Sequence, residues 1–287
     1  MLRRTRLDLP GRTALITGAG SGIGAATASA LVSRGAQVAL VDLPGGDHHT
    51  LAAALGDRAI ALDADVTDLA ALEAAVAATR ERFGSLDVVH ANAGIAARRP
   101  ATVAGTSIEE FERIVEIDLL GVWRTVRAAL PAVVEAGGHV VITASIYAFV
   151  NGMVNAPYAA SKAAVESLGR SLRAELAGTG ATAGVVYPGW VQTPIIDASF
   201  DDPTAGQQLR LAFPGPLLRP VTPERLADAI VDGIERRAPR TICPRRWVPV
   251  SLGRGVVNVV TDAVLDRHRR MQSLTREIDA RDETGHR

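Results

Sequence analysis

The sequence predicts an α/β fold with a doubly wound parallel sheet of about seven strands and helices on both faces. Short apolar runs alternate with longer segments of helical pattern, which is typical of right-handed βαβ units. Most of these runs are apolar almost throughout, as expected for parallel strands that helices cover on both sides. The expected strands are residues 13–17, 36–42, 59–66, 86–92, 138–145, 181–188 and 240–243.

The helices expected between these strands have recognisable ends. Asp68 is suited to cap a helix that Gly84 ends. Ser107 and Glu110 have the spacing of a capping box. Thr222 precedes a proline that suits the first position of a further helix.

Residues 1–244 show no linker and no internal repeat and are expected to form one domain. Within it, residues 194–220 are rich in Pro, Gly and Asp and are expected to form a lid over an active site. Residues 245–287 are expected to form a helical extension with a frayed end. Apolar residues recur in this extension at helical spacing, namely Val256, Val257, Val260, Val264 and Leu265. The pattern favours packing on the domain or on a second subunit over a membrane-surface helix, because the polar face also carries acids.

The composition indicates a globular protein without a charge bias. The 287 residues include 31 Lys and Arg and 31 Asp and Glu, so no overall field attracts nucleic acid or an anionic membrane. Uninterrupted apolar runs of about 18 residues do not occur, and the first residues lack the apolar core of a leader peptide. The sequence therefore predicts no transmembrane segment and a cytoplasmic location.

Neither a disulfide nor a metal site is expected. Cys243 is the only cysteine, which excludes an internal disulfide and favours a reducing compartment. His48 and His49 lie beside a Pro-Gly-Gly-Asp stretch, and without a third ligand they favour a solvated turn.

A glycine-rich stretch at residues 17–24, TGAGSGIG, directly follows the first expected strand and opens the first expected helix. Glycines there let a pyrophosphate approach backbone amides at a helix N-terminus, where the helix dipole favours anions. Asp42 closes the second strand, where a carboxylate binds ribose hydroxyls and repels a 2′-phosphate. Neither Ser21 nor Leu43 supplies the cation expected of an NADP site. We therefore expect NAD rather than NADP, the alternative being that Asp42 only caps a helix.

The spacing of these glycines is TGxxxGxG, and further motifs follow along the chain. They are DADV at 63–66, ANAG at 91–94, Ser145, YAASK at 158–162 and PGWVQT at 188–193. With these motifs, residues 11–243 resemble the short-chain dehydrogenase/reductase family. The resemblance implies a single-domain Rossmann-type fold and an NAD(P)-dependent oxidoreductase acting on CH–OH groups. It also implies a homodimer or homotetramer packed through the helix between the fourth and fifth strands and the Tyr158 helix.

The resemblance further implies which residues hold the cofactor. Those of the glycine-rich stretch are Gly18, Gly20, Ser21, Gly22, Ile23 and Gly24. Asp65 and Val66 are implied to contact the adenine, and Asn92, Ala93 and Gly94 to hold the fourth strand against the cofactor. Val191 and Thr193, which follow Pro188 and Gly189, are implied to contact the nicotinamide carboxamide. Taken alone, ANAG is equally consistent with an ordinary turn at a strand end.

Tyr158 and Lys162 lie four residues apart, so on a helix they project from one face. Lys162 is the only lysine among the 31 Lys and Arg residues, which indicates a need for a compact ammonium rather than a planar guanidinium. A nearby ammonium is expected to lower the pKa of the phenol, so Tyr158 is predicted to be the general base or acid. The alternative is a surface lysine beside a core tyrosine.

Ser145 ends the fifth expected strand, where its hydroxyl is suited to hydrogen-bond the substrate oxygen. Strand-end serines also form turns, but the Tyr158 motif favours the catalytic role. Tyr147 is not expected to be a rival base, because Asn151 rather than a cation stands four residues later.

Asp118 is a departure from the family, which usually has an asparagine there in its fifth helix, where it holds a water that links the lysine to solvent. A charged Asp118 lacks the amide donor and is expected to hold Lys162 as an ammonium more firmly. Three interpretations remain open: a tolerated variant with a shifted pH optimum, a slower enzyme, and a chain kept mainly for binding.

An apolar substrate pocket is expected beside these residues, which favours a hydrophobic secondary alcohol or its ketone. The expected walls are Ala96, Ile146, Phe149, Met153 and Trp190 with the lid residues Ile195, Ile196, Phe200, Leu209 and Phe213, and each is also consistent with a core contact. Arg98 and Arg99 are candidates to meet an acidic group at the rim. The predicted function is NAD-dependent oxidoreduction. The alternatives are a cofactor-binding scaffold or regulator and an NADP-dependent ketone reductase.

Overall fold

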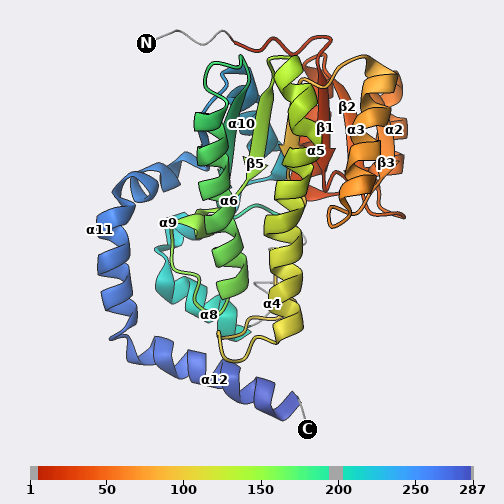
Figure 1. The fold of residues 1–287 in the computed structure, drawn as a ribbon. Coiled ribbons are helices and arrows are strands. Elements are labelled where there is room, and N and C mark those ends of the chain that lie inside the picture. The colour runs from red at the N-terminus through yellow and green to blue at the C-terminus, as the bar shows by residue number, and fades with distance from the viewer. Residues whose placement is uncertain (1–5, 194–202, 286–287) are drawn as a thin grey trace.

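A single parallel sheet of seven strands, in the order β3-β2-β1-β4-β5-β6-β7, forms the centre of the molecule (Figure 1). The structure, a computed structural model, describes residues 6–193 and 203–285. The strands are β1 Thr13–Thr17, β2 Gln37–Asp42, β3 Ala59–Asp63, β4 Val88–Ala91, β5 His139–Thr143, β6 Thr182–Pro188 and β7 Arg240–Cys243. Every expected strand is confirmed, several with shorter ends. Strand order reverses between β1 and β4, and a crevice for ligands is expected at the carboxyl ends of strands at such a point.

Helices cover both faces of the sheet, which confirms the doubly wound architecture. On one face, apolar side chains of α3 Leu69–Phe83, α5 Val122–Glu135 and α6 Ala156–Glu175 share a core with the strands. A second core on the opposite face includes side chains of α1 Gly22–Ser33, α2 His48–Leu55 and α10 Pro223–Glu235. The shorter elements are α4 Ile108–Val115, a π-helical segment Glu116–Gly121, α8 Pro203–Ala212, α9 Gly215–Leu218 and the 3₁₀ turns Gly56–Arg58, Ile146–Ala148 and Arg245–Trp247.

The predicted helix ends are confirmed with one difference. The Asp68 side chain accepts hydrogen bonds from the first turn of α3, and Gly84 ends that helix with a φ of 85°. Thr222 caps α10 in the same way. Ser107 caps α4, but the reciprocal half of the capping box does not form, because Glu110 instead accepts a hydrogen bond of 2.8 Å from the backbone of Arg98.

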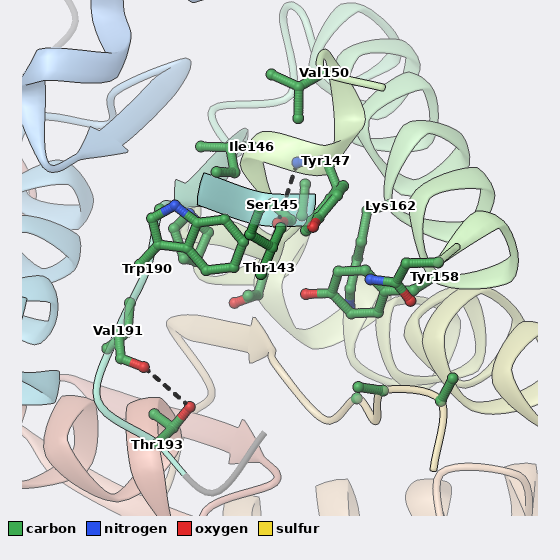
Figure 2. A pocket seen from close by; sticks show the side chains of 18 of the residues that line it. Thr143, Ser145, Ile146, Tyr147, Val150, Tyr158, Lys162, Trp190, Val191 and Thr193 are labelled. Carbon is green, nitrogen blue, oxygen red and sulfur yellow. Dashed lines mark hydrogen bonds between the residues drawn. The ribbon is translucent and has the colours of Figure 1, made fainter. Parts of the chain in front are cut away.

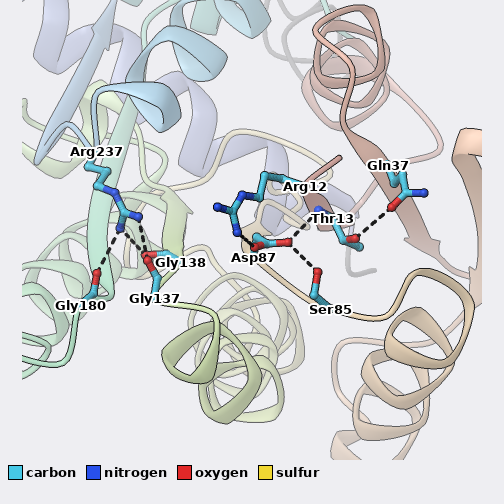
Figure 3. Close-up of polar contacts among 9 residues, drawn as sticks. All are labelled: Arg12, Thr13, Gln37, Ser85, Asp87, Gly137, Gly138, Gly180 and Arg237. Atoms are coloured by element: carbon cyan, nitrogen blue, oxygen red, sulfur yellow. Dashed lines mark hydrogen bonds and ion pairs between the residues drawn. The ribbon is translucent and has the colours of Figure 1, made fainter. Parts of the chain in front are cut away.

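At the amino ends of the strands, a buried carboxylate joins β1 to the segment before β4 (Figure 3). Asp87 is 1% exposed and lies 2.6 Å from Arg12 Nη1. It also accepts hydrogen bonds from the Thr13 amide at 3.0 Å and the Ser85 hydroxyl at 2.8 Å. Both carboxylate oxygens therefore have partners, as a buried charge requires.

Arg237 ties together the loops before β5 and β6 at this same end of the sheet (Figure 3). Its guanidinium donates to the carbonyl oxygens of Gly137 at 2.7 Å, Gly138 at 2.8 Å and Gly180 at 3.3 Å. A planar fork with several donors suits such a set of backbone acceptors in the two loops.

The extension after β7 forms two helices, α11 Val248–Leu265 and α12 Arg269–Gly285. In Figure 1, α11 runs along one side of the molecule and α12 crosses beneath it near α8. Trp247, just before α11, is fully buried and anchors the start of the extension. The extension is helical, and Val256 is 72% exposed and Val260 is 56% exposed, so these two valines do not pack on the domain. Packing of the extension on a second subunit stays a prediction.

One described stretch, Arg245–Leu265, is long and apolar enough to cross a membrane by length and composition, with a mean hydropathy of 1.3. Only 6% of that window is buried. The sequence criterion of an uninterrupted apolar run did not detect it, because glycines, Arg254 and Asn258 interrupt the valines.

His48 does not lie in the solvated turn that the sequence predicts. It begins α2 and is fully buried, with Nε2 2.9 Å from Asp63 Oδ1. His49 is exposed, and its Nε2 lies 2.8 Å from the same oxygen. The sequence reasoning lacked the pairing of β2 with β3, which brings Asp63 to these histidines as a third group of metal-binding type.

Candidate active site

The glycine-rich stretch turns directly from β1 into α1, and its shape depends on glycine. Gly18 has a φ of 66°, and a Cβ on it would lie 2.8 Å from the Cα of Ala93. A Cβ on Gly24 would lie 2.1 Å from the Gly18 carbonyl oxygen. No side chain caps the first turn of α1, so its backbone N–H groups are available to an anion. This turn therefore fits the pyrophosphate of a dinucleotide.

Asp42 lies at the carboxyl end of β2 and contacts the glycine-rich turn. Its Oδ2 accepts a hydrogen bond of 2.6 Å from the Gly20 amide, and its Oδ1 accepts one of 2.8 Å from the Leu43 amide. The alternative role as a helix cap is not supported, because α2 begins only at His48. Asp42 also lines the cavity described below. The sequence analysis did not foresee that the same carboxylate braces the turn.

Asn92 joins the carboxyl ends of β1, β4 and β5. Its Nδ2 donates to the Thr17 carbonyl at 3.1 Å, and its Oδ1 accepts from the Thr143 hydroxyl at 3.2 Å. Thr143 also lies 2.8 Å from His90 Nε2, and burial lowers the pKa of His90 to about 3. The ANAG motif is therefore more than a simple turn. Thr143 was missed, although it lies two residues before Ser145, on the same side of β5.

Tyr158 and Lys162 project from the first turns of α6 toward the carboxyl ends of β4 and β5 (Figure 2). Lys162 Nζ lies 5.3 Å from the centre of the Tyr158 ring and 3.0 Å from Asp118 Oδ2. Asp118 Oδ1 accepts a hydrogen bond of 2.7 Å from the Ile95 amide. Both charged residues are buried, with 3% of Lys162 and 0% of Asp118 exposed. The two side chains of the YxxxK motif thus meet, as the sequence predicts.

Asp118 lies in the π-helical segment Glu116–Gly121 between α4 and α5, rather than inside a regular helix. A π-helical segment interrupts the regular hydrogen-bond ladder and is frequent at functional sites. Here it carries Asp118 against Lys162 and the backbone of Gly94, where a Cβ would lie 3.0 Å from Lys162 Nζ.

The charged groups of this cluster shift the pKa values of one another. Burial raises the pKa of Asp118 against the opposing attraction of Lys162. For Lys162, burial acts to lower the pKa, but the carboxylate of Asp118 and the phenol of Tyr158 together outweigh it and leave that pKa raised. The carboxylate of Asp118 therefore favours the charged form of Lys162, as expected.

The expected lowering of the pKa of Tyr158 is wrong for the chain without a cofactor. Burial raises this pKa most strongly, and the negative charge of Asp118 adds to the increase. Lys162 and a hydrogen bond from Ser145 act in the opposite direction but do not offset the burial. Burial of the phenol depends on tertiary packing, which the spacing of the motif does not show.

Ser145 is held in a 3₁₀ turn directly after β5. Its Oγ accepts a hydrogen bond of 3.2 Å from the Tyr147 amide (Figure 2). The Tyr147 ring meets the Tyr158 ring edge-on, with 5.8 Å between centres. Burial raises the pKa of Tyr147 as well, but no cation acts to lower it as Lys162 does for Tyr158.

These side chains face one cavity of about 710 Å³ that begins at the glycine-rich turn. On its cofactor side, the cavity is lined by residues that the sequence singles out: Gly18, Ser21, Gly22, Ile23, Asp42, Asp65, Val66, Asn92, Ala93, Gly94, Pro188, Gly189, Val191 and Thr193. Gly20 and Gly24 act through packing instead. The donors and the turn fit a nicotinamide dinucleotide at this edge of the sheet.

The substrate side of the cavity is largely apolar. Of the expected walls, those that line it are Ala96, Ile146, Met153, Trp190, Leu209 and Phe213. The prediction that Phe149 lines the pocket is wrong, because the 3₁₀ turn directs its side chain into the core against Tyr187. Ile195, Ile196 and Phe200 lie outside the described residues, and Arg98 and Arg99 are exposed and do not line the cavity.

The far wall comes from the C-terminal extension, which the sequence analysis did not assign to the site. It is formed by Val257, Asn258, Val260, Thr261, Val264, Leu265, His268 and Met271. The valines at helical spacing were the available signal, but they do not show which face of the helix meets the domain.

Known proteins resemble this chain in sequence over most of its length. The family profile described as short chain dehydrogenase matches residues 12–204. The 2-(R)-hydroxypropyl-CoM dehydrogenase of Xanthobacter autotrophicus is 33% identical, covering 77% of this chain and 90% of the relative. The cis-4-hydroxycyclohexanecarboxylate dehydrogenase of Sinomonas cyclohexanicum is 37% identical, covering 76% and 87%.

Solved structures share the fold. The 3-ketoacyl-(acyl-carrier-protein) reductase of Brucella melitensis, solved with NADH, has a TM-score of 0.73 and 30% identity, covering 82% of this chain and 97% of that one. A short chain dehydrogenase/reductase of Burkholderia phymatum, solved with NAD, has a TM-score of 0.75 and 26% identity, covering 85% and 92%. With its dehydrogenase relatives and its nicotinamide-binding crevice, the chain belongs to the short-chain dehydrogenase/reductase family, as an oxidoreductase acting on CH–OH groups.

Proposed function

We propose that the protein is an NAD-dependent oxidoreductase that interconverts a hydrophobic secondary alcohol and its ketone, with Tyr158 as the general base or acid. One observation carries the proposal: Tyr158, Lys162 and Ser145 line the same cavity that the glycine-rich turn opens. A bound nicotinamide cofactor supplies the hydride acceptor or donor.

In oxidation, the Tyr158 oxygen takes the proton of the substrate hydroxyl, while the Ser145 hydroxyl binds the same substrate oxygen. Since burial and Asp118 raise the pKa of Tyr158 in the chain alone, a further positive charge has to act before the phenol ionises at neutral pH. Lys162, 5.3 Å from the ring centre, already acts to lower this pKa without offsetting the burial, so the further charge comes from elsewhere. The oxidised nicotinamide ring is positive and favours the phenolate further.

Asp118 holds Lys162 in place and in its charged form. The ion pair of 3.0 Å and the hydrogen bond to the Ile95 amide fix the carboxylate between the lysine and the loop after β4. The Lys162 ammonium can donate to ribose hydroxyls of a bound dinucleotide. Of the three interpretations of Asp118, this geometry favours the tolerated variant with a shifted pH dependence, because Asp118 pairs with Lys162 and Lys162 lies beside the Tyr158 ring.

The preference for NAD rests on Asp42. Its carboxylate lies at the carboxyl end of β2 and lines the cavity beside Leu43, which is 52% exposed and carries no charge. A carboxylate favours ribose hydroxyls as donors and repels a 2′-phosphate. NADP would need a cation at this position.

The substrate side favours a bulky apolar alcohol. Aromatic side chains of Tyr147, Trp190 and Phe213 contact one another edge to face along this wall, with ring centres about 6 Å apart. Such a surface binds alicyclic or long aliphatic carbon skeletons through burial of apolar area. The relatives named for a cyclohexane ring and a hydroxypropyl group are in keeping with a secondary alcohol.

A subunit contact is proposed on the face formed by α4 and α5. Phe111, Leu120 and Trp123 are exposed there although they are large and apolar. Burial of this face in a homodimer or homotetramer removes the patch from water.

The test is the formation of NADH from NAD with a panel of cyclic, steroidal and long-chain secondary alcohols. NADP is the cofactor control, and Tyr158→Phe is the variant control. The proposal expects turnover with NAD for an apolar alcohol and its loss in the variant. Binding of NAD without turnover of any alcohol in the panel supports the cofactor-binding scaffold instead, which Asp118 in place of asparagine keeps as the second candidate.

A further inference from the structure

Helix α11 has its polar and apolar faces in the reverse of the usual arrangement for a surface helix. The side chains exposed to solvent form an apolar row, with Leu252 75%, Val256 72%, Val259 68%, Val260 56% and Val264 55% exposed. Their spacing of three and four residues places them on one side of the helix. A surface helix that meets only water on its outer side normally turns its apolar face toward the protein core.

The polar side chains of α11 face the domain and are bonded to it. Arg254 Nη1 lies 2.8 and 2.9 Å from the two carboxylate oxygens of Glu166 on α6. The Asn151 amide donates to Asp262 at 3.0 Å. These contacts fix the rotation of α11, so its apolar row points outward. Asp262 is itself exposed, but Asn151 holds it on the domain side of the helix, away from the row.

Cationic side chains stand at both ends of the apolar row. Arg245 lies seven residues before Leu252, and Arg267 lies three residues after Val264. Both are exposed, as are Arg269 and Arg270 in the turn and first residues of α12. Asp266 is the exposed acid among them. An apolar helix face with arginines beyond its ends matches the boundary between acyl chains and anionic head groups.

The apolar row is continuous with the mouth of the cavity. Val260 and Val264 are more than half exposed and also line the 710 Å³ cavity. The outward face of α11 and the substrate side of the site therefore meet along one edge, which places an adsorbed surface next to the cavity.

We propose that the outward face of α11 docks the protein on the surface of an anionic lipid bilayer, with the helix lying in the plane of the interface. The helix does not cross the bilayer, because its other face is bonded to α6 and to Asn151. A second copy of the chain is the less suited occupant. The five side chains of the row offer on the order of 500 Å², whereas a stable interface buries about 800 Å² per partner.

The test is co-sedimentation of the full chain with vesicles, without substrate or cofactor. Vesicles of phosphatidylcholine mixed with phosphatidylglycerol are compared with phosphatidylcholine alone, at about 0.15 M and about 1 M salt. The proposal expects binding to the anionic vesicles that weakens at high salt. Sedimentation does not depend on the proposed dehydrogenase activity. Failure of vesicle binding would therefore not contradict the activity, and failure of the activity would not contradict vesicle binding.

A matched pair of variants tests the face itself. Leu252→Ser and Val103→Ser each change a side chain that is 75% exposed, but Val103 belongs to the segment before α4 and not to α11. We expect Leu252→Ser to lower the partition coefficient roughly tenfold and Val103→Ser to leave it unchanged. Neither residue lines the cavity, so the thermal midpoint and NAD affinity check that both variants are folded.

Two results would overturn the proposal. One is that the unaltered chain stays in the supernatant with both kinds of vesicle. The other is equal binding by the two variants. If the chain fails to sediment and Leu252→Ser lowers its molar mass in light scattering, α11 is a contact between subunits.

Discussion

The two ends of the sheet bury charged side chains for different purposes. At the amino ends, Asp87 has partners on both oxygens and lies away from the cavity. At the carboxyl ends, Lys162 and Asp118 are just as buried, but Lys162 also lines the cavity. The difference shows that a buried charge with protein partners on every side holds strands together, whereas one that faces a cavity is available to a ligand.

The largest expected effect breaks the chemistry at the carboxyl ends alone. Tyr158→Phe removes one hydroxyl, and we expect kcat/KM for alcohol oxidation to fall roughly thousandfold, because proton transfer loses its base. The free energy of unfolding is expected to change little, since the ring remains in place. Steady-state NADH formation and urea denaturation measure the two quantities.

Tyr147→Phe is the matched control for that variant. Its phenol lies in the same cavity, with its ring 5.8 Å from that of Tyr158, and has no cation at helical spacing. A fall in kcat/KM as large as that of Tyr158→Phe would show that the cluster does not single out Tyr158.

The next effect tests the amino ends. Asp87→Ala leaves the Thr13 amide without its acceptor and Arg12 without its partner, so we expect the free energy of unfolding to fall by about 2–3 kcal/mol. The activity of the folded protein is expected to persist. Urea denaturation measures the loss of unfolding free energy.

Glu135→Ala is the control: it breaks an exposed pair with Arg80 and is expected to lower the free energy of unfolding by less than about 1 kcal/mol. Equal losses in the two variants would contradict the comparison.

A third effect concerns nucleotide choice. Asp42→Asn keeps the shape of the side chain but removes its charge, so we expect affinity for NADH to fall about tenfold and discrimination against NADPH to narrow. Fluorescence titration with each nucleotide gives the two dissociation constants. Unchanged discrimination would mean that Asp42 only braces the glycine-rich turn.

The smallest effect sharpens the role of the ion pair. The negative charge of Asp118 raises the pKa of Tyr158, so Asp118→Asn lowers it. Oxidation needs the deprotonated phenol, and its rate rises as pH increases through this pKa. The acid limb of the pH–rate profile is therefore expected to move to lower pH, with a few-fold faster oxidation on that limb.

Glu116→Gln is the control for Asp118→Asn. It removes a carboxylate two residues away that pairs with Arg124 at 2.7 Å and does not line the cavity. Superimposable profiles for the unaltered chain and Asp118→Asn would show that position 118 has no part in proton transfer.

The sequence was sufficient where local chemistry decides the structure. Apolar runs located the seven strands, and Asp68, Ser107 and Thr222 located helix starts, because a capping side chain acts within one turn. The glycine-rich turn and the YxxxK spacing brought the central site residues together for the same reason.

The sequence was insufficient where packing decides. Phe149 lies three residues after Ile146, which lines the cavity, and one tight turn directs Phe149 into the core. The pKa of Tyr158 follows its burial rather than its distance from Lys162 in the sequence. The outward face of α11 depends on Arg254 and Asp262 finding partners far along the chain, which periodicity does not contain.

The two sides of the cavity are formed by different parts of the chain, and this has a consequence for how the reactants enter. The nucleotide side consists of strand ends and the first turn of α1, whereas the far wall is a strap, α11, which Glu166 and Asn151 hold at separate points. If α11 loosens at these two contacts, the entry for the alcohol widens while the residues on the nucleotide side of the cavity stay in place. The alcohol side of the cavity can therefore open while the nucleotide side stays fixed.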